Sequence, residues 1–269
     1  MFRANIFRFE LRRHLRSALW WSLGVVAIHL VYLPFFKTFA ENAAVLEESL
    51  KRFPKAFLEA FGMGRISMAT VLGFCTLIFL LVQIVLAIQA ARYGVALVSR
   101  EESERTADFL MTKPVSRRAI INSKLAAALV ALLATQAVLW VSTFAGWAAF
   151  SAGYEYDKGR LALLLSSALP FQLFFLAVGL AVSQAVRLVR NATPYALGLG
   201  LGAYALGAFS DIGGEVKLEW LTPFKYFDAA SLVLNGYEMR YLVLDLVIVA
   251  VALVFGYWRY LRRDIPTVT

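Results

Sequence analysis

The stretch ISMATVLGFCTLIFLLVQIVLAIQAA, residues 66–91, contains no aspartate, glutamate, lysine or arginine. A helix that crosses a bilayer needs about 20 mostly apolar residues, so this stretch is long enough to span a membrane. Four further stretches are equally free of charge, and a sixth is interrupted only by Asp245. The sequence therefore predicts an all-α integral membrane protein with a single transmembrane domain over residues 1–269. Its six expected spans lie at about residues 17–36, 66–91, 125–150, 161–186, 192–210 and 241–260.

The composition supports a membrane protein and offers little for catalysis. Hydrophobic residues make up 60% of the chain and charged residues 17%, whereas soluble domains have about half and a quarter. The only cysteine, Cys75, provides neither an intramolecular disulfide nor a cysteine-based metal site. The two histidines, His14 and His29, form no credible cluster with other ligands. We therefore expect no catalytic residues and no metal site, and an intramembrane enzyme ranks last among the possible functions.

The net charge of +9 is distributed as in a membrane protein rather than as in a nucleic-acid-binding protein. If the N-terminus lies inside, the inner segments hold 17 of the 27 basic residues but only six of the 18 acidic ones. This asymmetry follows the positive-inside rule and places both termini in the cytoplasm. Anionic lipid headgroups account for the excess of positive charge. We expect a protein of a bacterial or archaeal cytoplasmic membrane whose partner is the lipid bilayer and not a nucleic acid.

Two segments outside the spans are expected to form helices at the membrane surface. In residues 4–16, Phe7, Leu11 and Leu15 recur at four-residue spacing beside a parallel row of arginines, which is typical of an interfacial amphipathic helix. In the outer segment 211–240, scattered aromatic residues predict short helices that dip into the outer leaflet before the last span. The first outer loop, residues 37–65, carries a helical apolar stripe that Pro54 is expected to split.

The segment EESERTADFLMTKPVSRRAIINSK, residues 101–124, lies between the second and third expected spans. Ser99 with Glu102 matches a capping box, so we expect a short cytoplasmic helix to begin at Ser99 and to end before Pro114. Ser116 is placed to cap a second helix that continues into the third span. A solvated, positively charged loop would explain the basic residues. The apolar pair Phe109 and Leu110 is flanked by charged residues, however, and this pattern favours a docking surface for another protein.

This segment resembles the cytoplasmic loop of ATP-binding-cassette type-2 permeases. The resemblance rests on a glutamate, a threonine, a leucine, a Pro-Val-Ser-Arg run, an isoleucine and a lysine at matching spacing, here Glu101, Thr106, Leu110, Pro114, Val115, Ser116, Arg117, Ile120 and Lys124. Residues 4–16 are similar to the family's N-terminal elbow helix. The segment LTPFKYFD, residues 221–228, resembles the bacitracin-exporter branch. Arg105 stands where the family usually has glycine, which indicates that the helix continues there or that the contact is ionic.

The resemblance implies an export permease that works with a separate ATPase. In this family the loop is a coupling helix that enters a groove on a cytoplasmic ATPase, and two permease copies pair with two ATPase copies. The chain has no Gly-Lys pair and thus no phosphate-binding loop of its own, so ATP and Mg²⁺ would be bound by the partner and no cofactor by this chain. The expected docking residues are Glu101, Glu102, Arg105, Thr106, Phe109, Leu110, Pro114 and Arg117.

Several polar residues fall within the expected spans. Asp245 is interpreted either as a contact for a cation or substrate, or as a residue that pairs with Arg240 or Tyr241 or meets interfacial water; the second interpretation is favoured. Gln83, Gln136 and Gln172 either bond between helices or face a transport path. The sequence also fits a secondary transporter or channel that works without an ATPase, although five charge-free spans disfavour ion-coupled transport. It also fits a membrane anchor that uses the same loop to hold a cytoplasmic complex without transport. We expect the substrate to be amphiphilic or hydrophobic, and peptide antibiotics are one such class.

Overall fold

Long apolar stretches without internal proline form the main helices. The computed structural model describes residues 3–54, 57–58, 63, 65–103, 115–186, 188–213 and 218–262, and every regular element in these ranges is helical. The long helices are α1 (Ala4–Tyr32), α5 (Val71–Ser103), α7 (Arg117–Phe150), α9 (Ala168–Ala185), α10 (Ala192–Gly213) and α13 (Met239–Arg262). The short elements are η1 (Leu33–Phe35), α2 (Phe36–Glu41), α3 (Ala43–Leu50), α8 (Lys158–Ser166), η2 (Leu218–Leu221), α11 (Pro223–Tyr226) and α12 (Ala229–Asn235).

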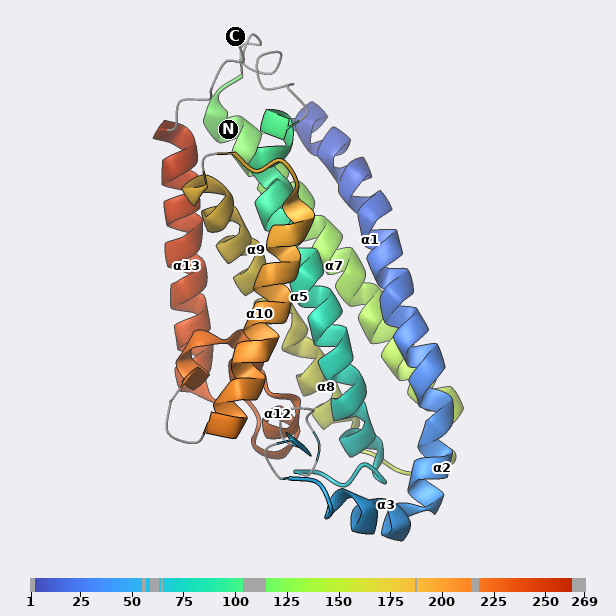
Figure 1. Cartoon of the computed structure of the whole chain (residues 1–269). Coiled ribbons are helices and arrows are strands. Elements are labelled where there is room, and N and C mark those ends of the chain that lie inside the picture. The colour runs from blue at the N-terminus through green and yellow to red at the C-terminus, as the bar shows by residue number, and fades with distance from the viewer. Residues whose placement is uncertain are drawn as a thin grey trace.

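The long helices form an elongated bundle with α5 at its centre (Figure 1). The most extensive packing joins α5 to α9 and α1 to α7, while α10 lies on α5 and α13 lies mainly on α9. At one end the Arg3 amide donates to Ser123 Oγ (3.0 Å) and Arg117 Nη1 to the Leu261 carbonyl (3.5 Å). The start of α1, the start of α7 and the end of α13 therefore meet there, and we call this the terminal end. The end that holds α3 and α12 is the opposite end (Figure 1).

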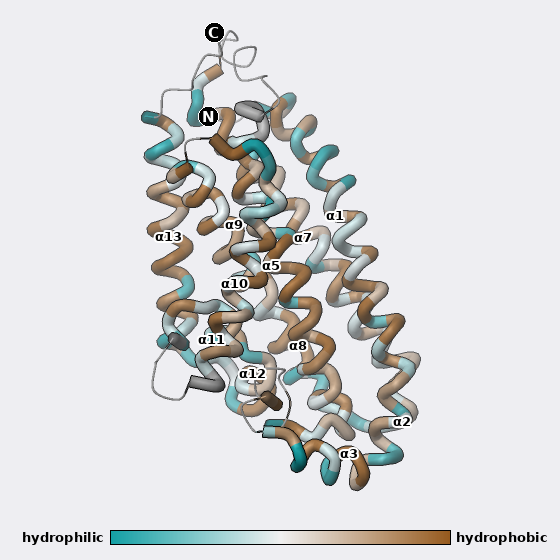
Figure 2. The backbone as a smooth tube through the Cα atoms, in the orientation of Figure 1, coloured by the Kyte–Doolittle hydropathy of each residue, from teal (hydrophilic) through white to brown (hydrophobic). Residues whose placement is uncertain are grey.

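The outer surface of the bundle is apolar. Helix α1 buries a stripe of small or polar residues that includes Ala18, Ser22 and His29, and it exposes larger apolar side chains such as Leu23 and Leu30. Figure 2 shows apolar stretches along the length of the long helices, with hydrophilic residues more frequent near the two ends. An exposed apolar surface of this size is unfavourable in water, whereas the hydrocarbon core of a bilayer accommodates it. The chain is a membrane protein.

Five helical segments among the described residues are long and apolar enough to cross a membrane. They are Ala4–Glu41, Val71–Ser99, Arg117–Phe150, Lys158–Ala185 and Met239–Arg262. Helix α10 packs along α5, but it is not among the five. The count of six spans therefore stays a prediction.

Two expected helix boundaries are wrong. Residues 4–16 do not form a separate elbow helix, because α1 runs without a break from Ala4 to Tyr32 and contains no proline that would stop it. Ser99 is not an N-cap, because it lies within α5, where its Oγ donates to the Val95 carbonyl (2.7 Å). The residues of a capping box are present in the sequence, but α5 continues through Ser99 to Ser103 instead of ending before it. The rest of the expected coupling helix, residues 104–114, lies outside the described residues.

Other local signals predict the observed elements. Ser116 caps α7 as expected, since its side chain accepts a hydrogen bond from the Ala119 amide (3.3 Å). Short helices occur before α13, where Asp228 caps α12 through the Ser231 amide (2.8 Å); whether they enter a membrane stays a prediction. A break between α8 and α9 at Ser167 was not expected. It lies just before Pro170, whose ring excludes a normal helical turn there.

Glycines bring the backbones of α5 and α9 into close contact. A Cβ atom on Gly94 would lie 2.1 Å from the Leu176 carbonyl oxygen, and one on Gly179 would lie 2.6 Å from the Ala91 carbonyl oxygen. Both obstacles are backbone atoms, which cannot move aside as a flexible side chain can. Small residues at such contacts let membrane helices pack tightly.

We expect Gly94→Ala and Gly179→Ala each to destabilise the protein by about 1–3 kcal/mol, because the added methyl group overpacks a backbone contact. Thermal unfolding of the detergent-solubilised protein measures this loss. Gly24→Ala is the matched control, since a Cβ atom there meets nothing within 4 Å. Equal melting temperatures for all three variants would contradict a close α5–α9 contact.

Candidate functional site

The expected docking segment lies at the terminal end, between α5 and α7. Glu101 and Glu102 lie in the last turn of α5, and Arg117 is the first residue of α7. Arg117 is half-buried and contacts the last turn of α13 through the Leu261 carbonyl. The remaining expected docking residues lie outside the described part of the chain: Arg105, Thr106, Phe109, Leu110 and Pro114.

A buried group of charges joins three helices at this end. Lys124 of α7 pairs with Glu10 of α1 (3.2 Å) and donates to the Leu97 carbonyl of α5 (2.8 Å). His14 lies one turn after Glu10, with 4.0 Å between His14 Nε2 and Glu10 Oε2, and its ring packs edge-on against Tyr93 of α5, with 4.7 Å between ring centroids. Glu10, His14 and Lys124 are each at most 5% exposed. We call Glu10, His14 and Lys124 the terminal charge cluster.

The terminal charge cluster was not predicted from the sequence, because Glu10 and Lys124 were expected in separate cytoplasmic segments. One signal was present: Glu10 is the only acid among the five arginines of residues 3–16. Its i, i+4 spacing from His14 places both side chains on one face of α1. Lys124 is the last residue of the recognised loop pattern. The cluster therefore connects the helices on either side of the docking segment to each other and to α1.

Glutamines form a second polar network, deep inside the bundle. Gln136 Nε2 of α7 donates to Gln172 Oε1 of α9 (2.8 Å), and Gln172 Nε2 donates to Gln89 Oε1 of α5 (3.2 Å). Gln89 Nε2 then donates to Thr135 Oγ1 of α7 (2.7 Å). The residues are at most 7% exposed. In this conformation Gln136 and Gln172 therefore bond between helices rather than face a path.

Gln83 has a similar role nearer the opposite end. Its Nε2 donates to the Phe227 carbonyl (2.9 Å), in the turn between α11 and α12. This bond ties α5 to the short elements that precede α13. Gln83 is 1% exposed, so its amide is also a bonded interhelical group in this conformation.

Asp245 is fully buried, which contradicts the favoured interpretation from the sequence. Its exposure is 0%, and among the described residues neither carboxylate oxygen has a hydrogen-bond partner. Arg240 pairs with Glu238 instead (2.7 Å), and the Tyr241 hydroxyl donates to Glu219 (3.0 Å). In this conformation Asp245 therefore neither pairs with its expected neighbours nor meets interfacial water, and its role as a contact for a cation or substrate stays a prediction.

Aromatic rings lie beside this carboxylate. Tyr226 of α11 stacks on Tyr241 of α13, with 5.5 Å between ring centroids and 16° between ring planes. The Tyr226 hydroxyl donates to the Trp220 carbonyl. Burial, together with the charges of Asp245 and Tyr241, raises the pKa of Tyr226 to about 12, so it stays a neutral phenol at physiological pH.

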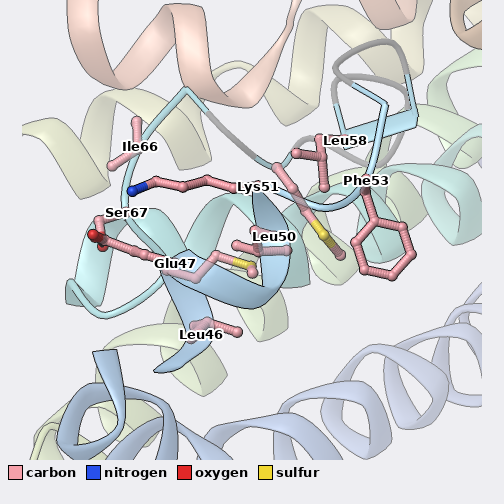
Figure 3. Close-up of a pocket in the computed structure, with 10 residues that line it drawn as sticks. Leu46, Glu47, Leu50, Lys51, Phe53, Leu58, Ile66 and Ser67 are labelled. Atoms are coloured by element: carbon pink, nitrogen blue, oxygen red, sulfur yellow. Dashed lines mark hydrogen bonds between the residues drawn. The ribbon is translucent and has the colours of Figure 1, made fainter. Parts of the chain in front are cut away.

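The opposite end carries a pocket of about 540 Å³ under α3. This volume lies within the range of small-molecule sites, about 300–1,000 Å³. Figure 3 shows Glu47, Lys51 and Ser67 on one side of the pocket, with Phe53 and Leu58 on the other. Ser67 Oγ donates to Glu47 Oε1 (3.0 Å). The remaining wall is apolar and is built by Leu46, Leu50, Met63, Ile66 and Met68. The pocket thus combines an apolar wall with a polar, charged edge.

Comparison with known proteins identifies the family of the whole chain. A family model described as "ABC-2 family transporter protein" matches residues 4–265. The match includes the terminal charge cluster, the glutamine network, Asp245 and the pocket. A search of curated proteins finds no match.

We expect Lys124→Met to destabilise the protein by about 3–5 kcal/mol, because it leaves the Glu10 carboxylate buried without its cation. Thermal unfolding in detergent measures the loss, and adding Glu10→Gln should recover part of it. Lys37→Met is the control, since it removes only an exposed pair with Glu41 (3.8 Å), worth at most about 1 kcal/mol. If Lys124→Met were as stable as Lys37→Met, the cluster would not hold the three helices together.

Proposed function

The chain belongs to the ABC-2 transporter family, as the membrane permease of an ABC transporter, and from this premise we propose that it couples ATP hydrolysis by a separate ATPase to the export of an amphiphilic substrate. Members of this family generally pair with an ATP-binding subunit. In the proposed assembly, ATP and Mg²⁺ are bound by that subunit, and two copies of this chain pair with two ATPase copies. The assembly lies in a cytoplasmic membrane, with the terminal end facing the cytoplasm.

The observation that carries the proposal is the family match, and the terminal charge cluster supports a route for coupling. The proposed coupling segment, residues 101–117, begins on the last turn of α5 and ends on the first turn of α7. Lys124 joins these two helices to each other and to α1 through Glu10 and the Leu97 carbonyl. A force applied to the segment would therefore reach three helices together, because buried, bonded contacts move as a unit.

The hydrogen bonds of the glutamine network determine which helices would resist separation during such a movement. The glutamine network holds α5, α7 and α9 together in the middle of the bundle. Helices α13 and α10 pack on α9 and α5 from the outside and take no part in these bonds. We propose that ATP-driven movement rocks the bonded group of α1, α5, α7 and α9 relative to α10 and α13, which opens a path between the groups.

The pocket at the opposite end supports an amphiphilic substrate. Its apolar wall suits an acyl or aromatic body, and its polar edge at Glu47, Lys51 and Ser67 suits a polar headgroup. In the proposed orientation this pocket faces the outside. It would receive a substrate after the path opens and before the substrate leaves.

We expect the Phe109→Asp, Leu110→Asp double variant to lose a stable complex with a candidate ATP-binding-cassette ATPase, because two charges replace the apolar pair of the docking surface. Co-purification after co-expression measures the complex, and monodisperse behaviour in detergent establishes that the variant is folded. Val45→Asp is the control, since this exposed residue lies on α3 at the opposite end and its variant should still bind.

The same experiment separates the proposal from its rivals. A double variant that binds as well as the wild type would remove the docking role of residues 109 and 110. If the wild type itself binds no ATPase tested, transport without an ATPase becomes the leading function. If the complex forms but ATP hydrolysis moves no solute, the chain is a membrane anchor.

We expect dansyl-dodecylamine, a single-chain amphiphile, to stimulate ATP hydrolysis by the complex in liposomes. In Leu50→Asp the half-maximal concentration should rise about fivefold, because a charge in the apolar wall removes roughly 1 kcal/mol of apolar contact. Val45→Asp, on the same helix but outside the pocket lining, serves as the control. An unchanged half-maximal concentration in Leu50→Asp would exclude the pocket from the substrate path.

A further inference from the structure

Asp245 has no counter-charge in this structure. It is the only charged residue in the run of residues 241–258, its exposure is 0%, and both of its carboxylate oxygens lack a partner among the described residues. A carboxylate taken out of water without a donor or a cation is strongly disfavoured. Intramembrane ionisable residues of this kind mark binding sites for ions or substrates. A cation that binds beside Asp245 would supply the partner that the described residues lack.

The neighbours of Asp245 define the chemistry of that partner. Tyr241 lies one turn before it on α13, so the two side chains share a face of the helix. Tyr226 stacks on Tyr241, and both hydroxyl groups donate elsewhere, to the Trp220 carbonyl and to Glu219. The stacking covers one face of each ring and Arg240 lies over the Tyr241 ring, so the two residues contribute aromatic surface rather than free hydroxyl groups. A carboxylate beside aromatic faces suits a cationic nitrogen that carries apolar substituents.

The same aromatic group already holds a cation at its outer edge. The Arg240 guanidinium lies 4.6 Å from the Tyr241 ring centroid and 6.0 Å from that of Trp220. Glu238 holds this guanidinium at 2.7 Å, and Glu219 lies beside it through the Tyr241 hydroxyl. Two acids at the edge lower the electrostatic energy of an approaching cation. The Tyr241 ring thus already contacts one organic cation, the Arg240 guanidinium.

A metal ion fits this surrounding poorly. Hard cations such as Ca²⁺ take six to eight oxygen ligands, and Mg²⁺ requires six. The hydroxyl groups of Tyr226 and Tyr241 are already bonded, and no cluster of three metal-binding side chains occurs in the described part of the chain. An organic cation needs only one carboxylate and apolar or aromatic contacts.

We propose that Asp245, Tyr226 and Tyr241 form a binding site for an organic cation, a quaternary or protonated amine with an apolar body. The proposal rests on the proposed function, since it assigns a positive charge to the amphiphile that the permease exports. The site is closed in this structure. Helix α13 packs mainly on α9 and takes no part in the glutamine network, so its movement away from α9 would open Asp245 to a ligand.

The test compares a cation with its uncharged copy. Benzyltrimethylammonium and neopentylbenzene differ only in a nitrogen or carbon at the centre of the same shape. Calorimetric titration of the full chain in lipid nanodiscs measures both affinities. We expect the wild type to prefer the cation by about tenfold or more, because a charged contact in an apolar surrounding is strong.

The variants assign this preference to named residues. Asp245→Asn should abolish it without unfolding the protein, because the change removes a buried charge that has no partner. Tyr226→Phe should retain it, since the ring face is kept, whereas Tyr226→Leu should weaken cation binding several-fold. Asp157→Asn is the matched control: Asp157 caps α8 at the exposed opposite end, and asparagine caps equally well.

Three results would overturn the proposal. The first is equal affinity of the wild type for both probes, and the second is an unchanged preference in Asp245→Asn. The third is a shift of Asp245→Asn to a smaller oligomer. That shift would mean that a basic residue of a second copy is the partner of Asp245. Co-purification with the ATPase is measured on the same variants. An intact complex without a cation preference would refute this site and leave the proposed function standing.

Discussion

The backbones of α5 and α9 touch at Gly94 and Gly179, and the other long helices are positioned around this contact. Helix α10 packs on α5, α13 packs on α9, and the pair formed by α1 and α7 packs against α5. In a bilayer, lipid tails are as apolar as leucine side chains, so burial of apolar surface does not by itself hold helices together. Close backbone packing and hydrogen bonds between helices supply that attraction instead.

The distribution of polar groups follows from the same constraint. Inside the bundle, each glutamine of the network and each member of the terminal charge cluster has a partner on another helix. Partnered groups add stability and fix which helices move together. Asp245 stands apart from these groups, because it is equally buried and has no hydrogen-bond partner among the described residues. This contrast separates residues that hold the bundle from the residue that we propose as a cation contact.

The proposed transport cycle assigns separate tasks to the two ends. At the terminal end, Lys124 and Glu10 connect the helices around the coupling segment, so movement of a docked ATPase is carried into the bundle. At the opposite end, the aromatic rings around Tyr241 and the pocket under α3 provide the surfaces that meet a substrate. The glutamine network lies between the two ends and keeps α5, α7 and α9 together.

Length and hydropathy were enough to predict an all-α membrane protein, because a bilayer forces every apolar stretch of about 20 residues into a helix. The cap at Ser116 was also predictable, since a cap depends on only a few neighbouring residues. The continuity of α1 and of α5 past Ser99 was not, because helix ends depend on packing as well as on local patterns. The pairing of Glu10 with Lys124 and the isolation of Asp245 were decided only by the tertiary structure. The sequence does not reveal whether a charged residue has a partner on a distant helix or has none. Only packing in three dimensions distinguishes these two cases.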